Sequence, residues 1–353
     1  SLSTGSSWTT TGTIGIALMA IGKAYGFADG MIAGAIISGA YFGDKMSPLS
    51  DTTNLAPAMA GTDLFTHIRH MVYTSVPAMI IALIGFSILN YFHGDTAPSM
   101  HQINQISLSL EKSFTISIWL LIVPALVFFL VMKKVPALPT LIFSILFGLL
   151  AAILTQQEML LKMASTPGLT GMYGVLISAL GEGVSIKTSS PVINDLLSRG
   201  GMSSMLSTVW LIICAMVFGG ALEVTGMLQR IANSILSLVR GTGTLIGATL
   251  ASSIFTNATA CDQYIAIVLP GRMFKNAYSK FGLHPKNLSR AVEDAGTVTG
   301  VLIPWNSGGA YNSGILGVPT LTYLPYCFFN LASPLISAFL GAMNMTIEKK
   351  LEK

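Results

Sequence analysis

The sequence predicts an all-α polytopic membrane protein with discontinuous transmembrane helices. Three observations carry this prediction: the composition, long apolar runs, and two polar interruptions within such runs. Of 353 residues, 52% are hydrophobic and 10% are charged, with a mean hydropathy of +0.68, which is typical of helical membrane proteins. Runs at 116–132, 138–154 and 321–340 approach the ~20 apolar residues that cross a bilayer core, whereas barrel strands would alternate.

The first polar interruption, residues 43–54, reads GDKMSPLSDTTN between two apolar stretches. It contains the carboxylates Asp44 and Asp51 and the polar side chains Thr52 and Asn54. Backbone that unwinds inside a membrane exposes carbonyls and helix ends, which together with carboxylates and hydroxyls can replace the water shell of Na⁺. The alternative is a solvated loop between two short helices. In either case Lys45 is expected to neutralise Asp44.

The second interruption, residues 256–263, reads TNATACDQ. Phe42 and Pro57 are fifteen positions apart, and so are Phe255 and Pro270, so the two interruptions occupy corresponding places. Interrupted spans in matching positions of two halves indicate a transporter binding site. Asp262 is the strongest candidate, because ionisable groups within spans are usually functional. It also suits the cap of the helix that follows, a role compatible with ion binding. The polar neighbours grouped with it are Asn257 and Thr259.

Three further acidic residues interrupt apolar sequence. Glu223 lies near the end of the apolar run 205–228. Two interpretations are open: it is buried and carries a proton, or it lies at the membrane edge. Glu293 and Asp294 are adjacent, and because neighbours on a helix point ~100° apart, only one can face a site directly. The glycine-rich segment that contains Asn306 and Ser307 is either an external loop or a re-entrant loop lining the pathway.

Several functional classes find no support in the sequence. The three cysteines are scattered without paired spacing, which argues against a disulfide framework or a zinc site. A net charge of +4 spread among loops suggests anchoring at the membrane faces, with no nucleic-acid partner. The motifs of serine hydrolases, metalloproteases, P-loop proteins and dinucleotide-binding proteins are missing. We expect that the protein is not an enzyme and that it needs no cofactor.

We interpret residues 1–353 as a single transmembrane transporter domain, with helices expected upstream of Ser1. Within it, 1–91 would be the remainder of a first repeat, 92–204 scaffold helices and a connection, and 205–340 a second repeat. The segment 61–70 is interpreted as a loop or interfacial turn, followed by a span at 72–91, and 229–240 as an interfacial helix.

The motif around the first interruption, residues 43–57, resembles the signature of the NhaC family of bacterial sodium/proton antiporters. The likeness extends over nearly the whole chain, through DLFTHIRHM at 63–71, TN at 256–257 with CDQY at 261–264, SRAVEDAGT at 289–297 and PWNSGGAY at 304–311. It implies a fold of two inverted repeats and exchange of Na⁺ for H⁺. A related branch is thought to exchange malate and lactate with coupling to H⁺ and Na⁺.

Taken together, these interpretations predict a multi-pass antiporter of the bacterial cytoplasmic membrane that works by alternating access. Its expected partners are Na⁺, H⁺ and the lipid bilayer, with a homodimer left open. Asp262 and Asp51 would bind Na⁺, and Glu223 and Asp294 would carry protons. The alternatives are an organic-anion exchanger that uses cationic residues, and an intramembrane aspartyl protease that uses Asp44 or Asp51. The cationic candidates are Arg69, Arg290 and Lys45.

Overall fold

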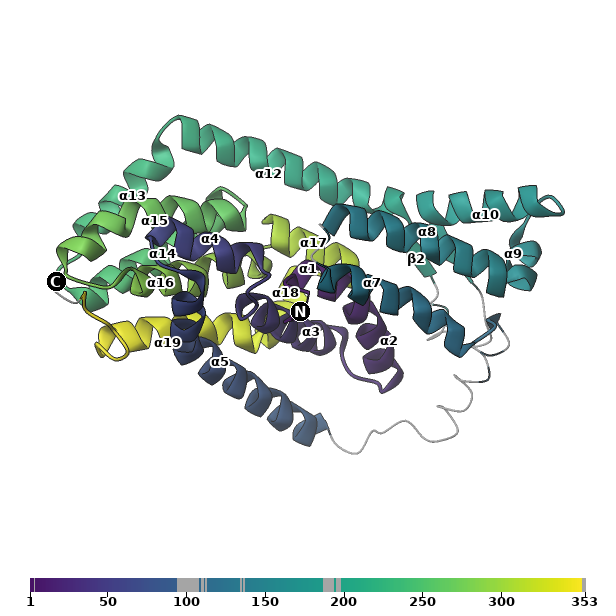
Figure 1. Ribbon diagram of the computed structural model, residues 1–353, viewed down its shortest axis with the longest axis horizontal. Helices are drawn as coiled ribbons and strands as arrows, with labels where there is room; N and C mark the ends of the chain where they lie inside the picture. Colours follow the sequence, from purple (N-terminus) through teal and green to yellow (C-terminus); the bar gives the residue numbers. More distant parts are fainter. Residues whose placement is uncertain are drawn as a thin grey trace. The chain divides into compact units, whose positions relative to one another are not determined.

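The computed structural model describes residues 1–2, 4–93, 108, 111, 113–133, 135, 137–186, 194 and 198–350. The chain divides into two compact units, which are described separately (Figure 1). The larger consists of Ser1–Gly22, Phe27–Asp95 and Thr208–Lys353, and the smaller of Lys23–Gly26 and Thr96–Ser207. Both are predominantly helical, which confirms the predicted fold class at that level.

The larger unit contains the helices that position the candidate site. Those lying wholly or mostly in it are α1 (Ser7–Thr10), the π-helical turn η1 (Thr11–Gly15), α2 (Ile16–Ala24), α3 (Asp29–Lys45), α4 (Asp51–Ala60), α5 (Leu64–His93), α12 (Leu206–Val224), α13 (Met227–Ser237), α14 (Thr242–Thr259), α15 (Gln263–Lys280), α16 (Pro285–Thr299), the 3-10 turn η4 (Gly300–Leu302), α17 (Ser307–Leu316), α18 (Thr320–Tyr323), the 3-10 turn η5 (Leu324–Tyr326) and α19 (Phe328–Ala342).

The smaller unit is a helical hairpin with short elements around it. Its core is formed by Leu160, Met172 and Leu176. Several segments of the scaffold and connection predicted at 92–204 lie outside the described residues. Its elements are the 3-10 turn η2 (Ile118–Leu121), α7 (Ile122–Met132), α8 (Ala137–Thr155), α9 (Gln157–Met163), α10 (Leu169–Gly181), the antiparallel strands β1 (Gly183–Ser185) and β2 (Ser198–Gly200), which pair Gly183 with Gly200, and the 3-10 turn η3 (Met202–Met205).

Two helices among the described residues, Leu64–Phe92 and Met202–Leu222, are long and apolar enough to cross a membrane. Two bent pairs would raise this number to four if each pair forms one span: 142–155 with 157–163, and 320–326 with 328–342. Their bends of 92° and 59° show that apolar runs are interrupted in places other than the two polar motifs.

Helix α5 begins earlier than the sequence indicated, so the predicted loop at 61–70 is wrong beyond Asp63. The Asp63 carboxylate accepts a hydrogen bond from the Thr66 backbone N–H at 2.9 Å, which satisfies one free donor of the first helical turn. Hydrogen bonds from Thr66 also hold the pKa of the Asp63 carboxyl below its usual value. Pro77 lies inside α5 without ending it.

The run predicted as one span at 205–228 is two helices in the structure. Helix α12 ends at Val224 and α13 begins at Met227, with Gly226 between them at φ +72°. This left-handed conformation favours glycine because it has no Cβ. The chain therefore leaves the span before the end of the apolar run.

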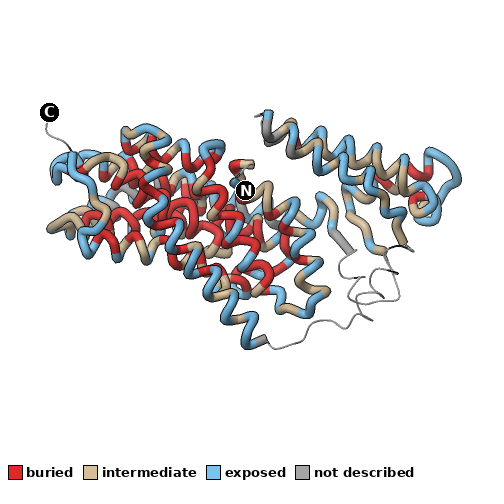
Figure 2. The backbone as a smooth tube through the Cα atoms, turned by 60° about the horizontal axis from the view of Figure 1, so that its bottom comes forward, coloured by how far each residue is buried: buried red, intermediate tan, exposed pale blue. Residues whose placement is uncertain are grey.

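Helix α16 forms the centre of the larger unit, and every residue from Asn287 to Thr299 is buried. In Figure 2 the buried segments are concentrated in this unit. Val292 and Ala295 on α16 join an apolar cluster with Ala56 of α4 and Ile267 of α15, so the helices on both sides of the site pack against it. Charged residues on a helix this deeply buried need partners or a function.

Candidate functional site

The first polar interruption is a break between two helices, α3 and α4. Helix α3 ends at Lys45 and α4 begins at Asp51. The Thr53 hydroxyl joins the two ends by hydrogen bonds to the backbone carbonyls of Asp44 (3.2 Å) and Lys45 (3.1 Å). The Ser50 side chain caps α4 by accepting from the Thr53 N–H. The break is thus a fixed turn between two helix ends.

The acidic residues of this break lie in different environments. Asp44 is buried, and its Oδ2 accepts hydrogen bonds from the Ser7 hydroxyl at 2.6 Å and the Ser7 backbone N–H at 3.1 Å. Asp51 is exposed in the first turn of α4. Thr52 is buried and contacts the Ser50 hydroxyl at 3.1 Å. The exposed Asn54 donates to carbonyls of the turn, Pro48 O at 2.9 Å and Ser50 O at 2.7 Å.

The second interruption is a break between α14 and α15. Helix α14 ends at Thr259, and Cys261 takes φ +60°, an uncommon conformation for a residue other than glycine. Asp262 then caps α15, as predicted: its Oδ1 accepts from the backbone N–H groups of Tyr264 (2.8 Å) and Ile265 (3.1 Å). Its side chain is half-buried. The Thr259 hydroxyl donates to Phe255 O within α14.

An amide network ties the second break to α16 and α17. Asn257 is fully buried and donates to Gly296 O at 2.7 Å and the Thr299 hydroxyl at 3.0 Å. Asn306 in turn donates to Asn257 O at 2.9 Å and caps α17 by accepting from the Gly308 N–H. Asn306 and Ser307 are buried, so this segment is not the external loop that the sequence left open.

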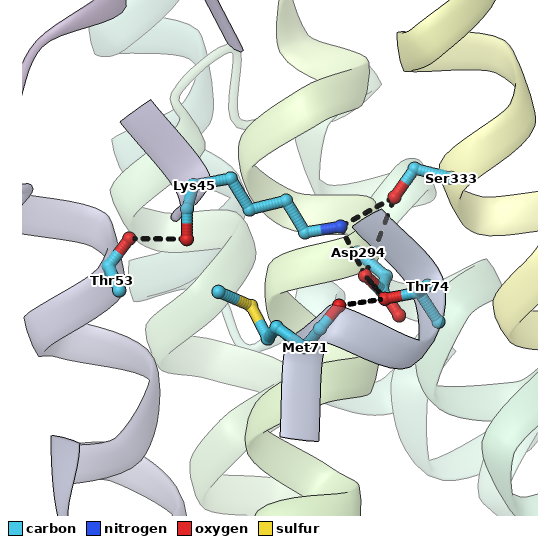
Figure 3. Close-up of polar contacts among 6 residues, drawn as sticks. All are labelled: Lys45, Thr53, Met71, Thr74, Asp294 and Ser333. Carbon is cyan, nitrogen blue, oxygen red and sulfur yellow. Dashed lines mark hydrogen bonds and ion pairs between the residues drawn. The ribbon is translucent and has the colours of Figure 1, made fainter. Parts of the chain in front are cut away.

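Asp294 on α16 forms a fully buried ion pair with Lys45 at the end of α3 (Figure 3). Ser333 of α19 lies 2.6 Å from the Lys45 ammonium nitrogen, and the Thr74 hydroxyl of α5 donates to Asp294 Oδ1 at 2.8 Å. The expectation that Lys45 neutralises Asp44 is therefore wrong. Adjacent helix residues point in different directions, and Lys45 points into the bundle toward α16.

Glu293 precedes Asp294 and lacks the lysine and hydroxyl partners that Asp294 Oδ1 has. It is fully buried, and neither carboxylate oxygen has a hydrogen-bond partner among the described residues. Its helix also packs against α4, which begins at the first break. A charged carboxylate in such a place is strongly disfavoured without a bound cation or proton.

Helices from the two breaks pack together. Helix α4 of the first break lies beside α15 of the second (Figure 1). Helix α16, which carries Glu293, contacts both of them. Both breaks therefore border one region of the larger unit.

Comparison with known proteins places this arrangement in a family. The model of the Na⁺/H⁺ antiporter family matches residues 39–345. The chain belongs to the Na⁺/H⁺ antiporter family. No solved structure matches it.

Three relatives illustrate the similarity. The Na⁺/H⁺ antiporter NhaC of Alkalihalophilus pseudofirmus is 38% identical over 347 residues, which cover 98% of this chain and 72% of the relative. The NhaC antiporter of Bacillus subtilis is 37% identical over 338 residues, covering 96% and 72%. A malate-2H⁺/Na⁺-lactate antiporter of B. subtilis is 36% identical over 331 residues, covering 94% and 68%. These findings support Na⁺/H⁺ exchange as the activity and an integral membrane location.

For this antiporter, the sequence located both helix breaks but missed several contacts around them. Glu223 lies in α12, and its side chain is outside the described part of the chain. The residues that hold the buried charges belong to no recognisable motif. The one signal in the sequence is Lys45, because an ionisable residue beside an apolar run needs a partner within the bundle. The residues missed are Ser7, Thr74 and Ser333.

Proposed function

We propose that this antiporter exchanges Na⁺ for H⁺ across the bacterial cytoplasmic membrane by alternating access, with Glu293 as the carboxyl that carries the proton. The observation behind the proposal is the environment of Glu293, a carboxyl fully buried on the central helix without a hydrogen-bond partner among the described residues. Family membership supports Na⁺ and H⁺ as the exchanged ions, and the burial of Glu293 supports its role as the proton carrier.

Exchange follows from competition at one buried charge. An empty carboxylate inside the protein is disfavoured by several kcal/mol, so the protein would change its open side only after a cation has neutralised the site. A proton on Glu293 meets this requirement, and so does Na⁺ bound beside it. Because the two cations exclude each other, each return movement carries the other ion.

The helix breaks are the proposed source of Na⁺ ligands. Among the described residues no group of three or more His, Cys, Asp or Glu side chains is close enough to hold a metal ion. Carbonyl, hydroxyl and amide oxygens would therefore complete the shell around one or two carboxylates, as unwound transporter helices allow. The candidates remain those of the sequence: Asp44, Asp51, Thr52, Asn54, Asn257, Thr259 and Asp262.

The two breaks also support the proposal of inverted repeats. The first break lies between Phe42 and Pro57, and the second lies between Phe255 and Pro270. The phenylalanine and the proline are fifteen positions apart in both cases. In both, one helix ends, a short capped turn follows, and the next helix contains the proline. Corresponding broken helices in two halves are the usual sign of this architecture.

Organic-anion exchange is the second candidate, because one relative is named as a malate and lactate antiporter. Such a carrier needs a cationic group free to bind a carboxylate. Lys45 is paired with Asp294, Arg290 donates to the Thr346 hydroxyl, and Arg69 is exposed. The partners of Lys45 and Arg290 favour inorganic cations, and the exposed Arg69 is the candidate that an organic-anion exchanger would use. The protease alternative has no support in a family of antiporters.

The test is ion flux in proteoliposomes that contain the full-length protein and an internal pH dye. We expect external Na⁺ to change the internal pH without any organic acid. Pulses of Li⁺ and K⁺ measure cation selectivity, and pulses of malate and lactate test the second candidate. A pH change that requires malate or lactate would replace Na⁺/H⁺ exchange with organic-anion exchange.

A further inference from the structure

The adjacent acids Glu293 and Asp294 present a charge problem at the centre of the larger unit. Both are fully buried, and if both were free to bind cations, the empty site would carry two charges on neighbouring residues. The structure treats them differently: Asp294 has a lysine partner and a hydroxyl donor, whereas Glu293 has neither.

We infer that Lys45 is a built-in cation that neutralises Asp294 throughout the transport cycle, so that Glu293 alone of the adjacent acids exchanges Na⁺ for H⁺. This inference rests on the proposed function and adds to it the number of charges that take part. Lys45 is then a positioning residue, because it acts through Asp294 and touches no transported ion.

The contacts of the pair explain why it stays closed. The Lys45 ammonium is held by Ser333 of α19 as well as by Asp294 of α16, and Asp294 is held by Thr74 of α5. Four helices thus meet at two buried charges (Figure 3). Moving the ammonium away would leave a buried carboxylate and a buried hydroxyl without these partners, which is strongly unfavourable.

Other charged groups nearby do not replace either partner. Arg290, one turn before Asp294, donates to Thr346 and forms no ion pair within the described residues. His67 on α5 binds the Ser289 hydroxyl at 2.8 Å. Asp44 is occupied by Ser7.

The experiment compares unbalanced and balanced charges in the full-length protein in proteoliposomes. Lys45→Met and Asp294→Asn each leave one buried charge without its partner, and we expect Na⁺-driven proton flux to be lost in both. The double variant K45M/D294N removes both charges with side chains of similar shape, and we expect flux to return with the wild-type Na⁺/H⁺ ratio, measured as the ion gradients at which net flux is zero.

A second charge-balanced variant, K45D/D294K, keeps the pair in reversed order and is also expected to recover flux relative to the single variants. A folded double variant K45M/D294N without flux would show that Asp294 itself carries ions. Thermal unfolding is a second, independent test. If both charge-balanced variants unfold at lower temperatures than the single variants, the two charges do not neutralise each other. Wild-type protein without any Na⁺-driven flux would instead refute the proposed function.

Discussion

At the residue scale, Asp262 combines two roles in one carboxyl group. Oδ1 accepts both backbone hydrogen bonds that cap α15, which leaves Oδ2 and the negative charge for another partner. The side chain is half-buried beside the second break. A carboxylate at a helix start is favoured by the free N–H groups there and by the helix dipole.

Substitution can separate these two roles. Asn caps a helix about as well as Asp, so Asp262→Asn should keep the thermal unfolding midpoint and lose Na⁺-driven flux, because only the charge is removed. Asp262→Ala should also lose about 1 kcal/mol of stability, the usual effect of removing a cap. Thermal unfolding in detergent and flux in proteoliposomes measure the two effects. Normal flux in Asp262→Asn would remove Asp262 from the Na⁺ site.

At the element scale, the two breaks are held by hydrogen bonds to backbone groups that the helices leave unpaired. In the first, Thr53 joins α4 to the carbonyls at the end of α3. In the second, Asn257 and Asn306 join α14, α16 and α17. Unpaired backbone groups inside a membrane protein are unfavourable, so these side chains allow a helix to stop in the bundle.

Removing one of these side chains should weaken the second break. Asn257→Ala removes the hydrogen bonds to Gly296 O and the Thr299 hydroxyl and one of the two bonds that the Asn306 amide donates, and the expected loss is about 1–3 kcal/mol of unfolding free energy. Asn276→Ala is the matched control, because Asn276 is exposed on the neighbouring helix α15. Denaturation in detergent compares the two variants. An equal loss in both would show that the amide network does not hold the break.

The sequence predicted the breaks better than it predicted the helices around them. Polar runs inside apolar sequence revealed both breaks, and the Asp262 cap followed from its position before an apolar stretch. The start of α5 was missed because its first turns mix polar and apolar residues, Phe65, His67 and Arg69 among them, and so resemble a loop. Asp63 nevertheless provides a cap there. Pairing between distant elements was also missed: Lys45 and Asp294 are 249 positions apart, and no local pattern connects them.

At the scale of the whole molecule, the larger unit is arranged around α16 as a buried polar axis. Apolar side chains of α16 pack against α4 and α15, and its Asp294 forms the ion pair with Lys45 at the end of α3, where the first helix break begins. Both breaks precede α16 in the sequence, and both contribute helices that contact it. Family membership fits this design, because an antiporter needs one buried site that two cations compete for.

In the proposed exchange, Na⁺ displaces a proton from Glu293. The most direct measurement is proton release on addition of Na⁺ to the purified full-length protein in weak buffer with a pH indicator. We predict release from the wild type and from the control Glu158→Gln, which changes an exposed acid of the smaller unit, and no release from folded Glu293→Gln. If Glu293→Gln released as many protons as the wild type, Glu293 would not be the group that Na⁺ deprotonates.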